Sequence, residues 1–263
     1  MNNVLEHTIN AARLAGDYLR QHALDGDGIE YKKVNDPVTP HDRAAERIMR
    51  AYLDEHAPGN HIGEEYGEEN LGLARTYIHD PIDGTKEWLL RGFQCSTSIG
   101  IEENGELVGG VVHDFMRGIT YAGYRSETFL DYNGARIPLH RPQPLSKRRI
   151  EITKNSSLKD RLPSDRYSTS EKGGSIALSL AELAAGNYDG VISPEIGKGN
   201  IWDVAAGAYL CKAVGIEMWD AYGNPFDHHN AKHGFVGVRP EISDDIRKYC
   251  IFMPQSTDAS LRT

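Results

Sequence analysis

The chain has 263 residues, a formal net charge of -9 at pH 7, 39% hydrophobic residues and 25% charged residues. A chain of this length and composition can bury one large core or two coupled lobes, as globular proteins do. The acidic balance, without a basic block, argues against a broad surface for nucleic acid or an anionic membrane. The three scattered cysteines predict neither a disulfide framework nor a zinc site. We find no signal peptide and no long apolar span, and we therefore expect a soluble, cytoplasmic protein.

Two helices are predicted in the first part of the chain. Apolar residues recur at helical spacing over residues 3–24, which predicts a helix with one buried face. For the second helix, Thr39 is predicted as the N-cap, Pro40 as the first helical residue and Asp42 as the third. This helix is predicted to end before Pro58. Asp42 thus has a structural role available without any catalytic one.

Alternating apolar residues and turn residues predict an antiparallel meander in the middle of the chain. Strands are expected at residues 95–101, 107–115, 118–124 and 128–130, with turns at 103–106 and 132–134. Residues 138–147 carry three prolines and several basic residues. We expect this segment to join two sub-lobes, about 1–140 and about 148–263, of a single unit that spans residues 1–263.

The second sub-lobe is predicted to alternate helices and strands. The helices are expected at residues 175–185 and 200–215, and the strands near 152 and at 188–193, 216–220 and 235–238. The tail after Pro254 is expected to be loose.

The segment 80–88 places two carboxylates close together. Asp80 and Asp83 leave one predicted turn, which follows the β-prone residues 76–79. Pro81 holds the backbone extended, so that both carboxylates and the Ile82 carbonyl could converge on a hard cation. The alternative is a polar turn between a strand and a helix, with Asp83 as the helix N-cap.

Two further acids are candidates for the same place. Glu64 follows a short apolar pair and Gly63, so that the end of a strand could aim it at Asp80. Asp203 lies near the start of its helix, where a carboxylate is also favoured without any metal. If these acids converge, a pair 4 Å apart repels by about 4 kcal/mol at an effective dielectric constant near 20, so the site needs cations. Ligands that are all oxygen atoms favour Mg²⁺ or Mn²⁺ over zinc.

Three motifs share one order along the chain: Gly-Glu-Glu at 63–65, Asp-Pro-Ile-Asp-Gly-Thr at 80–85 and Trp-Asp at 202–203. Together they resemble the inositol monophosphatase superfamily of metal-dependent phosphatases, and the resemblance extends from the first helix to about Val238. It implies an α/β (α+β) fold, a layered αβαβα sandwich of the sugar phosphatase type. The N-terminal lobe is then an antiparallel meander and the C-terminal lobe mixed α/β.

The resemblance implies a set of metal ligands. Glu64, Asp80 and the Ile82 carbonyl would hold one Mg²⁺, for which Mn²⁺ is a possible substitute. A second Mg²⁺ would lie between Asp80, Asp83 and Asp203. The activity implied is Mg²⁺-dependent hydrolysis of a small phosphate monoester by water that two or three metal ions activate.

The resemblance also implies the residues that handle water and phosphate. Asp42 and Thr85 would orient and deprotonate the attacking water, and Glu64 completes the implied catalytic set. Backbone N–H groups of Gly84 and Thr85, next to Asp83, would hold the phosphate. No phosphoenzyme nucleophile is needed, so Cys95 has no predicted role.

The choice of substrate stays open between branches of the superfamily. The short, plain layout suits inositol monophosphate or a related sugar or polyol phosphate. Segments 86–87 and 200–203 look like the branch that dephosphorylates 3'-phosphoadenosine 5'-phosphate, and segment 63–67 is similar to histidinol-phosphate phosphatases. Gly174, Ser175 and Glu195 fall where the family contacts its substrates, although the stretch after Glu195 departs from the spacing of the inositol enzymes. For Gly174 the alternative is a simple loop before a helix.

A different class of function is a regulatory binding protein that retains the fold without catalysis. Intact ligands at every motif position disfavour it, and the acidic charge disfavours RNA as a partner. From the resemblance we expect a homodimer, inhibition by lithium and a small phosphorylated substrate as the main partner.

Overall fold

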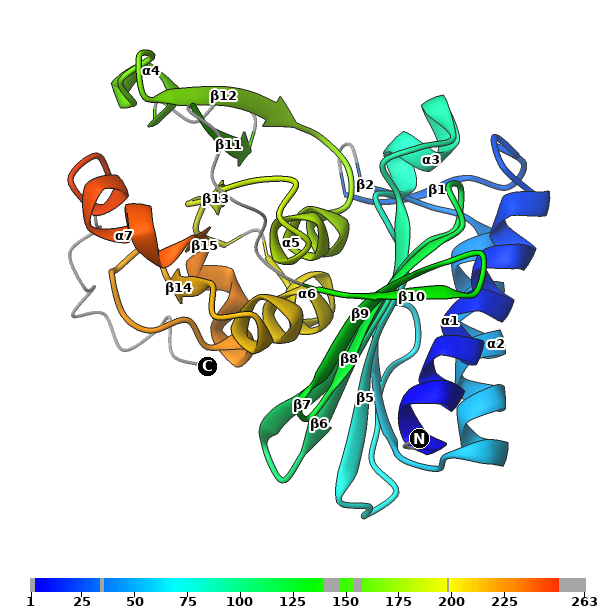
Figure 1. Cartoon of the computed structure of the whole chain (residues 1–263). Helices are drawn as coiled ribbons and strands as arrows, with labels where there is room; N and C mark the ends of the chain where they lie inside the picture. Colours follow the sequence, from blue (N-terminus) through cyan, green and yellow to red (C-terminus); the bar gives the residue numbers. More distant parts are fainter. Residues whose placement is uncertain (1–2, 34–35, 140–146, 154–157, 198, 251–263) are drawn as a thin grey trace.

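The structure is a computed structural model that describes residues 3–33, 36–139, 147–153, 158–197 and 199–250. Figure 1 shows five layers, and the chain therefore has the αβαβα arrangement expected from the sequence. The layers are helices α1 (Asn3–Gln21) and α2 (Pro40–His56), an eight-stranded sheet, helices α5 (Ile176–Ala184) and α6 (Ile201–Ala213), a five-stranded sheet, and helix α7 (Pro240–Arg247).

The eight-stranded sheet has the strand order β10-β9-β8-β7-β6-β5-β3-β4. From β5 to β10 each strand pairs antiparallel with the next one along the chain, which confirms the predicted meander. Strand β3 is parallel to β5 and antiparallel to β4. The strands are β3 (Asn60–Gly63), β4 (Gly67–Glu69), β5 (Arg75–Asp83), β6 (Ser96–Glu103), β7 (Glu106–Asp114), β8 (Ile119–Tyr124), β9 (Glu127–Tyr132) and β10 (Ala135–Pro138).

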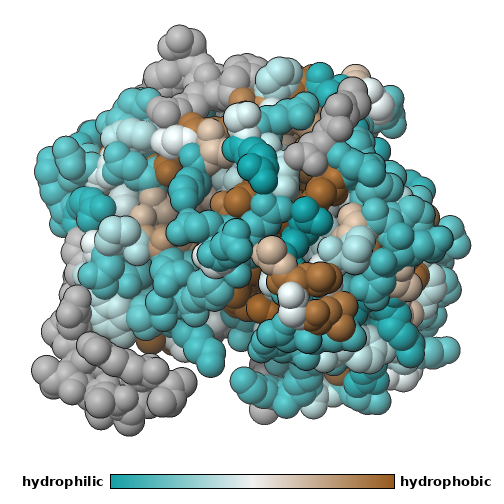
Figure 2. All heavy atoms as spheres, turned by 90° about the horizontal axis from the view of Figure 1, so that it is seen from below, coloured by the Kyte–Doolittle hydropathy of each residue, from teal (hydrophilic) through white to brown (hydrophobic). Residues whose placement is uncertain are grey.

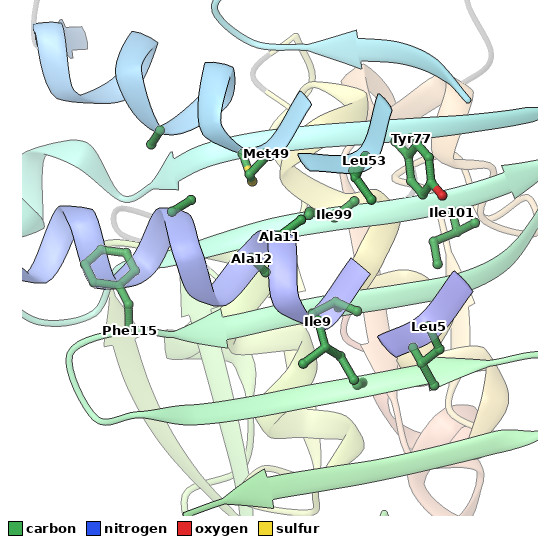
Figure 3. Packing of buried hydrophobic residues seen from close by; sticks show 14 of the residues in the cluster. Leu5, Ile9, Ala11, Ala12, Met49, Leu53, Tyr77, Ile99, Ile101 and Phe115 are labelled. Carbon is green, nitrogen blue, oxygen red and sulfur yellow. The ribbon is translucent and has the colours of Figure 1, made fainter. Parts of the chain in front are cut away.

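Helices α1 and α2 cover the outer face of this sheet. Figure 3 shows their apolar side chains packed with those of the strands, among them Leu5, Ile9, Met49, Leu53 and Ile99, none of which is more than 2% exposed. The helical spacing of these residues puts one apolar stripe of each helix against the sheet, and their burial is the main source of stability here.

The start of α2 is as predicted. Thr39 is the N-cap, Pro40 follows it, and Asp42 closes a capping box: Thr39 N–H donates to Asp42 Oδ2 over 2.8 Å. Helix α1 ends at Gln21, earlier than the predicted residue 24. Leu24 itself has the left-handed φ of 65°, which does not continue a helix.

Helix α6 lies unusually close to the inner face of the eight-stranded sheet because glycines face it. A Cβ at Gly110 of β7 would lie 2.5 Å from the Ala206 carbonyl oxygen, and one at Gly100 of β6 would lie 2.7 Å from the Ala205 Cβ. The small residues on both sides allow this close contact. It holds the first turn of α6, which carries Asp203, against the strands that carry the other acids.

The five-stranded sheet has the order β12-β11-β13-β15-β14. Strands β12, β11 and β13 are parallel, and β15 is antiparallel to both β13 and β14. The remaining elements of this part are β11 (Arg148–Thr153), α4 (Leu158–Arg161), β12 (Tyr167–Lys172), β13 (Gly190–Ser193), β14 (Glu217–Trp219), the 3₁₀ helix η1 (His228–His233) and β15 (Phe235–Val238). The predicted alternation of helices and strands is confirmed, but β12, α4, η1 and α7 were not predicted.

Three short elements lie near the end of β5. They are the antiparallel pair β1 (Glu30–Lys33) and β2 (Asp36–Val38), and helix α3 (Thr85–Arg91). The turn predicted at residues 80–83 is instead the last part of β5, whose pairing with β6 becomes irregular between Asp80 and Asp83. Most of the predicted boundary segment 138–147 and the tail after Pro254 lie outside the described residues.

The surface is mainly polar on the face shown in Figure 2, where hydrophobic residues gather in a small central area. Within the described residues, no helix has the length and apolar character needed to cross a membrane.

Candidate active site

Three aspartates from two elements meet at the end of β5. Asp80 and Asp83 belong to β5, and Asp203 lies in the first turn of α6. One carboxylate oxygen of each lies within 4.8 Å of the other two. In a regular strand, residues three apart point to opposite faces, so the irregular pairing between Asp80 and Asp83 is what lets both reach this place.

Burial and mutual repulsion destabilise the charged forms of these acids. The pKa of Asp80 is raised well above its usual value, first by burial and then by the charges of Glu64, Asp83 and Asp203. Burial followed by the charge of Asp83 likewise raises the pKa of Asp203. Within the described part of the chain, Oδ1 of Asp80 is buried without a hydrogen-bond partner. A hard divalent cation fits this donor set, because it would offset the repulsion and coordinate the unpaired oxygen.

Asp203 also has the structural role that its sequence position allows. The backbone N–H of Asn200 donates to Asp203 Oδ2 over 2.8 Å, which caps the start of α6. The cap fixes the direction of this carboxylate. Asp203 can therefore both cap α6 and act as a metal ligand.

Glu64 lies beside the three aspartates, directly after β3. Its Oε1 accepts a hydrogen bond of 2.9 Å from Nζ of Lys32, which also contacts Glu65 at 2.5 Å. The charge of Glu64 nevertheless acts on Asp80, whose pKa it helps to raise. Lys32, on β1, is a residue of this site that the sequence analysis did not assign. The signal available was a pair of lysines at 32–33 in an acidic chain.

Asp42 and Thr85 are joined by a hydrogen bond, although 43 residues separate them. Thr85 Oγ1 lies 3.0 Å from Asp42 Oδ1 and 2.9 Å from the Ile82 carbonyl oxygen, so its single proton is directed to one of these acceptors. Burial raises the pKa of Asp42 to about 6, against the hydrogen bonds from Thr39, which lower it. A pKa of about 6 suits Asp42 to act as a base at neutral pH, and Asp42 faces a hydroxyl beside the acidic cluster.

Asp83 is not the cap of the helix that follows it. Helix α3 begins at Thr85, and its N-cap is Gly84, which makes no side-chain cap. Instead, Oδ2 of Asp83 accepts hydrogen bonds of 2.7 Å from Ser175 Oγ and from the backbone N–H of Ala177, at the start of α5. The alternative prediction, that Asp83 is the N-cap of the next helix, is therefore wrong. The Asp83 carboxylate instead accepts hydrogen bonds at the start of α5, in the other half of the chain.

Ser175 is fully buried and its hydroxyl is occupied within the protein. Besides donating to Asp83, Oγ accepts from the backbone N–H of Leu178 over 2.9 Å as the N-cap of α5, and it lies 2.8 Å from Ser96 Oγ. Its predicted contact with a substrate stays a prediction.

Two glycines allow the close approach of the loops before α3 and α5. Gly84 has a φ of 90° and Gly174 a φ of 109°. A Cβ at Gly174 would lie 2.4 Å from the Gln94 carbonyl oxygen, and one at Gly84 would lie 2.7 Å from the same atom. Ser175 N–H donates to that oxygen over 2.9 Å, so the strand-side loop and the start of α5 are joined here.

The last predicted substrate residue, Glu195, follows β13 and is partly buried. It lies two residues after Ser193, which together with Gly174 lines a small cavity of about 30 Å³ between β13 and α5. The structure thus brings Gly174 and Ser193 to one cavity, while the contact of Gly174 and Glu195 with a substrate stays a prediction.

Comparison with known proteins decides the family. The model of the inositol monophosphatase family matches residues 1–246. This chain belongs to the inositol monophosphatase family. Its members are metal-dependent phosphatases, so the chain is a phosphoric monoester hydrolase of a family that uses divalent metals, and the acidic cluster offers a place for them.

Individual relatives show the same similarity. An inositol monophosphatase of Mesembryanthemum crystallinum is 30% identical over 246 residues, covering 86% of this chain and 88% of the relative. The 3'(2'),5'-bisphosphate nucleotidase CysQ of Shigella flexneri is 28% identical over 236 residues, which cover 86% of this chain and 94% of that relative. Among solved structures, the IMPase of Thermotoga maritima has a TM-score of 0.80 at 27% identity, with 94% of this chain and 96% of that chain covered.

Proposed function

We propose that this protein is a Mg²⁺-dependent phosphatase whose substrate is inositol monophosphate or a related sugar or polyol phosphate. The observation that supports this most is the meeting of Asp80, Asp83 and Asp203 beside the Asp42–Thr85 pair. Bound Mg²⁺, or Mn²⁺ in its place, would attract the phosphate, lower the pKa of a bound water and steady the leaving oxygen.

The proposed metal ligands are the three aspartates with Glu64 and the Ile82 carbonyl. Glu64 accepts a hydrogen bond from Lys32, and the Ile82 carbonyl oxygen lies 2.9 Å from the Thr85 hydroxyl. Carboxylate and carbonyl oxygens have further lone pairs, so these bonds do not prevent a second role.

Asp42 and Thr85 are proposed to prepare the attacking water. When the Thr85 hydroxyl donates its proton to Asp42, the lone pairs of the Thr85 oxygen remain free to accept a hydrogen bond from water. Ionised Asp42 is the base that this arrangement requires, and it takes the proton through the threonine hydroxyl.

The phosphate is proposed to bind at Asp83, Gly84 and Thr85, where the backbone turns from β5 into α3. The rest of the substrate would then lie toward Gly174, Ser175 and Glu195. These substrate contacts rest on the resemblance of the motifs, supported by the approach of Gly174 to Gly84 through the Gln94 carbonyl.

A second candidate is 3'-phosphoadenosine 5'-phosphate. It is favoured by the similarity to CysQ, a 3'(2'),5'-bisphosphate nucleotidase, of which the match covers 94%. Histidinol phosphate is a third, less supported candidate, because it rests on the segment 63–67 alone.

The test is phosphate release from a panel of inositol phosphates, sugar phosphates, 3'-phosphoadenosine 5'-phosphate and histidinol phosphate, with Mg²⁺, with Mn²⁺ and with a chelator. We expect the highest kcat/KM on an inositol or polyol phosphate, and no release with the chelator. A higher value on the nucleotide would transfer the proposal to the second candidate. No release from any of them would contradict the function.

Three further properties are proposed. We expect a homodimer and inhibition by lithium from the family resemblance, together with the cytoplasmic location expected from the sequence. Light scattering of the purified protein and phosphate release in the presence of LiCl test the first two, and fractionation of cells tests the third.

A further inference from the structure

A second cluster of possible metal ligands lies between β6 and η1. The Nε2 atoms of His228 and His229 each lie 2.9 Å from the same oxygen, Oε2 of Glu102. The three ligand atoms all lie within 4.8 Å of one another. Two neighbouring residues of η1 thus reach one carboxylate of the eight-stranded sheet.

This cluster is separate from the acidic site. On β6, the partner of Asp80 is Ser98, whereas Glu102 lies opposite Thr76. At roughly 3.3 Å per residue, Glu102 lies about 13 Å along the strand from the level of Asp80. The two clusters therefore share no ligand.

Glu102 is a mostly buried carboxylate with two histidines beside it. Its side chain is 12% exposed and that of His228 11%. Within the described residues, no lysine or arginine lies within 4.0 Å of Glu102, and its ionic partners are the two histidines. A carboxylate that is largely removed from water is stabilised by a cation bound beside it.

The second nitrogen of His228 faces another carboxylate. Nδ1 lies 3.6 Å from Oδ1 of Asp227. Asp227 is held in place, because its carboxylate accepts from the backbone N–H of His229 over 3.0 Å and from Nδ2 of Asn230 over 2.7 Å. At 3.6 Å this contact is longer than a hydrogen bond, but it places a carboxylate on the side of the ring where one commonly orients a ligating histidine.

We propose that Glu102, His228 and His229 bind Zn²⁺, or a similar transition metal such as Co²⁺, in a site distinct from the acidic cluster. Two imidazoles and one carboxylate are a donor set typical of zinc, and imidazole nitrogen disfavours Mg²⁺. Around a tetrahedral Zn²⁺, with bonds of about 2.0–2.2 Å, ligand atoms lie roughly 3.3 Å apart. The side chain of His229 is 47% exposed, so it can move outward by the small amount needed.

The bound metal would join η1 to the central sheet. Helix η1 also packs against the segment that leads into α6, since a Cβ at Gly199 would lie 2.7 Å from the Ala231 carbonyl oxygen. A bound metal would therefore stabilise the fold where α6 begins.

The experiment uses the full chain carrying Asp83→Asn, to weaken binding at the acidic site, in saturating Mg²⁺. Zn²⁺ is titrated by calorimetry, and Co²⁺ by its visible absorption, which reports tetrahedral coordination. We expect one Zn²⁺ per chain, an intense Co²⁺ spectrum and a rise in melting temperature with Zn²⁺. His229→Ala should weaken binding by more than about 100-fold, since loss of an outer-shell partner alone costs 10–100-fold.

Two further variants complete the design. Glu102→Gln should also weaken binding, and His56→Ala is the matched control, because His56 is an exposed histidine on α2 that does not belong to this cluster. The proposal is overturned if Zn²⁺ does not bind, or if His229→Ala binds it as tightly as His56→Ala does. The melting temperature of His229→Ala without metal should equal that of the unchanged chain, which shows that lost binding is not lost folding.

Discussion

The carboxylate of Asp83 caps a helix that begins in the other half of the chain: its Oδ2 accepts a 2.7 Å hydrogen bond from the backbone N–H of Ala177, 94 residues later. The same side chain lies within the acidic cluster. One residue thus joins the metal-site strand to the middle helical layer, and its two roles can be separated by mutation.

We expect Asp83→Asn to abolish most phosphate release while changing the free energy of unfolding little. The amide oxygen still accepts from Ala177 and Ser175, but the negative charge is lost. Asp83→Ala also removes the acceptor, so it should cost a further 0.5–2 kcal/mol, about the value of an N-cap. Chemical denaturation and phosphate release measure the two effects. Near-normal turnover of the asparagine variant would refute the site assignment.

Removing the metal should reveal the repulsion at Asp80. Its raised pKa in the folded state means that the folded protein binds a proton more readily than the unfolded one. This group therefore destabilises the metal-free protein at neutral pH, and the penalty is relieved as the pH falls toward the usual carboxylate range. We expect Mg²⁺ to raise the melting temperature by linkage.

Asp80→Asn serves as the matched variant for that measurement. Without metal it should melt at a higher temperature than the unchanged chain at pH 7, and Mg²⁺ should raise its melting temperature much less. Equal responses of both proteins to Mg²⁺ would show that Asp80 does not hold the ion.

The pair Asp42–Thr85 predicts how activity depends on pH. Because burial raises the pKa of Asp42 to about 6, its base form is lost as the pH falls through that value. We expect kcat to fall tenfold per pH unit below about 6, and the profile to flatten above it. Asp42→Asn should lower kcat by a factor of about 10²–10⁴ at pH 7. A kcat that is constant from pH 7 to 5 would contradict a role for Asp42 as base.

Thr85→Ser and Thr85→Ala distinguish the threonine hydroxyl from the threonine methyl. Serine keeps the oxygen that reaches Asp42, so it should retain much of the activity, whereas alanine should lose it. Circular dichroism of both variants checks that α3 still forms. Equal kcat values for serine and alanine would show that the hydroxyl does not act on the water.

Gly174 should not tolerate a side chain. An alanine there would keep the left-handed φ of 109° and would place its Cβ 2.4 Å from the Gln94 carbonyl oxygen. We expect Gly174→Ala to lower stability by more than the roughly 1–3 kcal/mol of such backbone strain, because the clash with the Gln94 carbonyl adds to it. The exposed Gly134, with a φ of 80° and open space around it, is the control, because Gly134→Ala has the backbone penalty alone.

Local rules of the chain determined much of this protein. The capping residues of α2, the apolar stripe of α1 and the turns of the meander all follow from short-range steric and hydrogen-bonding preferences, and the structure has them where they were expected. The order of the three acidic motifs was enough to indicate the family.

Only the tertiary structure decided how the acids meet. Asp80 and Asp83 share a face because strand pairing breaks between them, and Asp203 reaches them because glycines let α6 approach the sheet. The bond from Ala177 to Asp83, the contact of Lys32 with Glu64 and the cluster of Glu102 with two histidines join segments far apart in the chain. Short-range preferences carry no information about such contacts, because they depend on which faces pack together once the layers form.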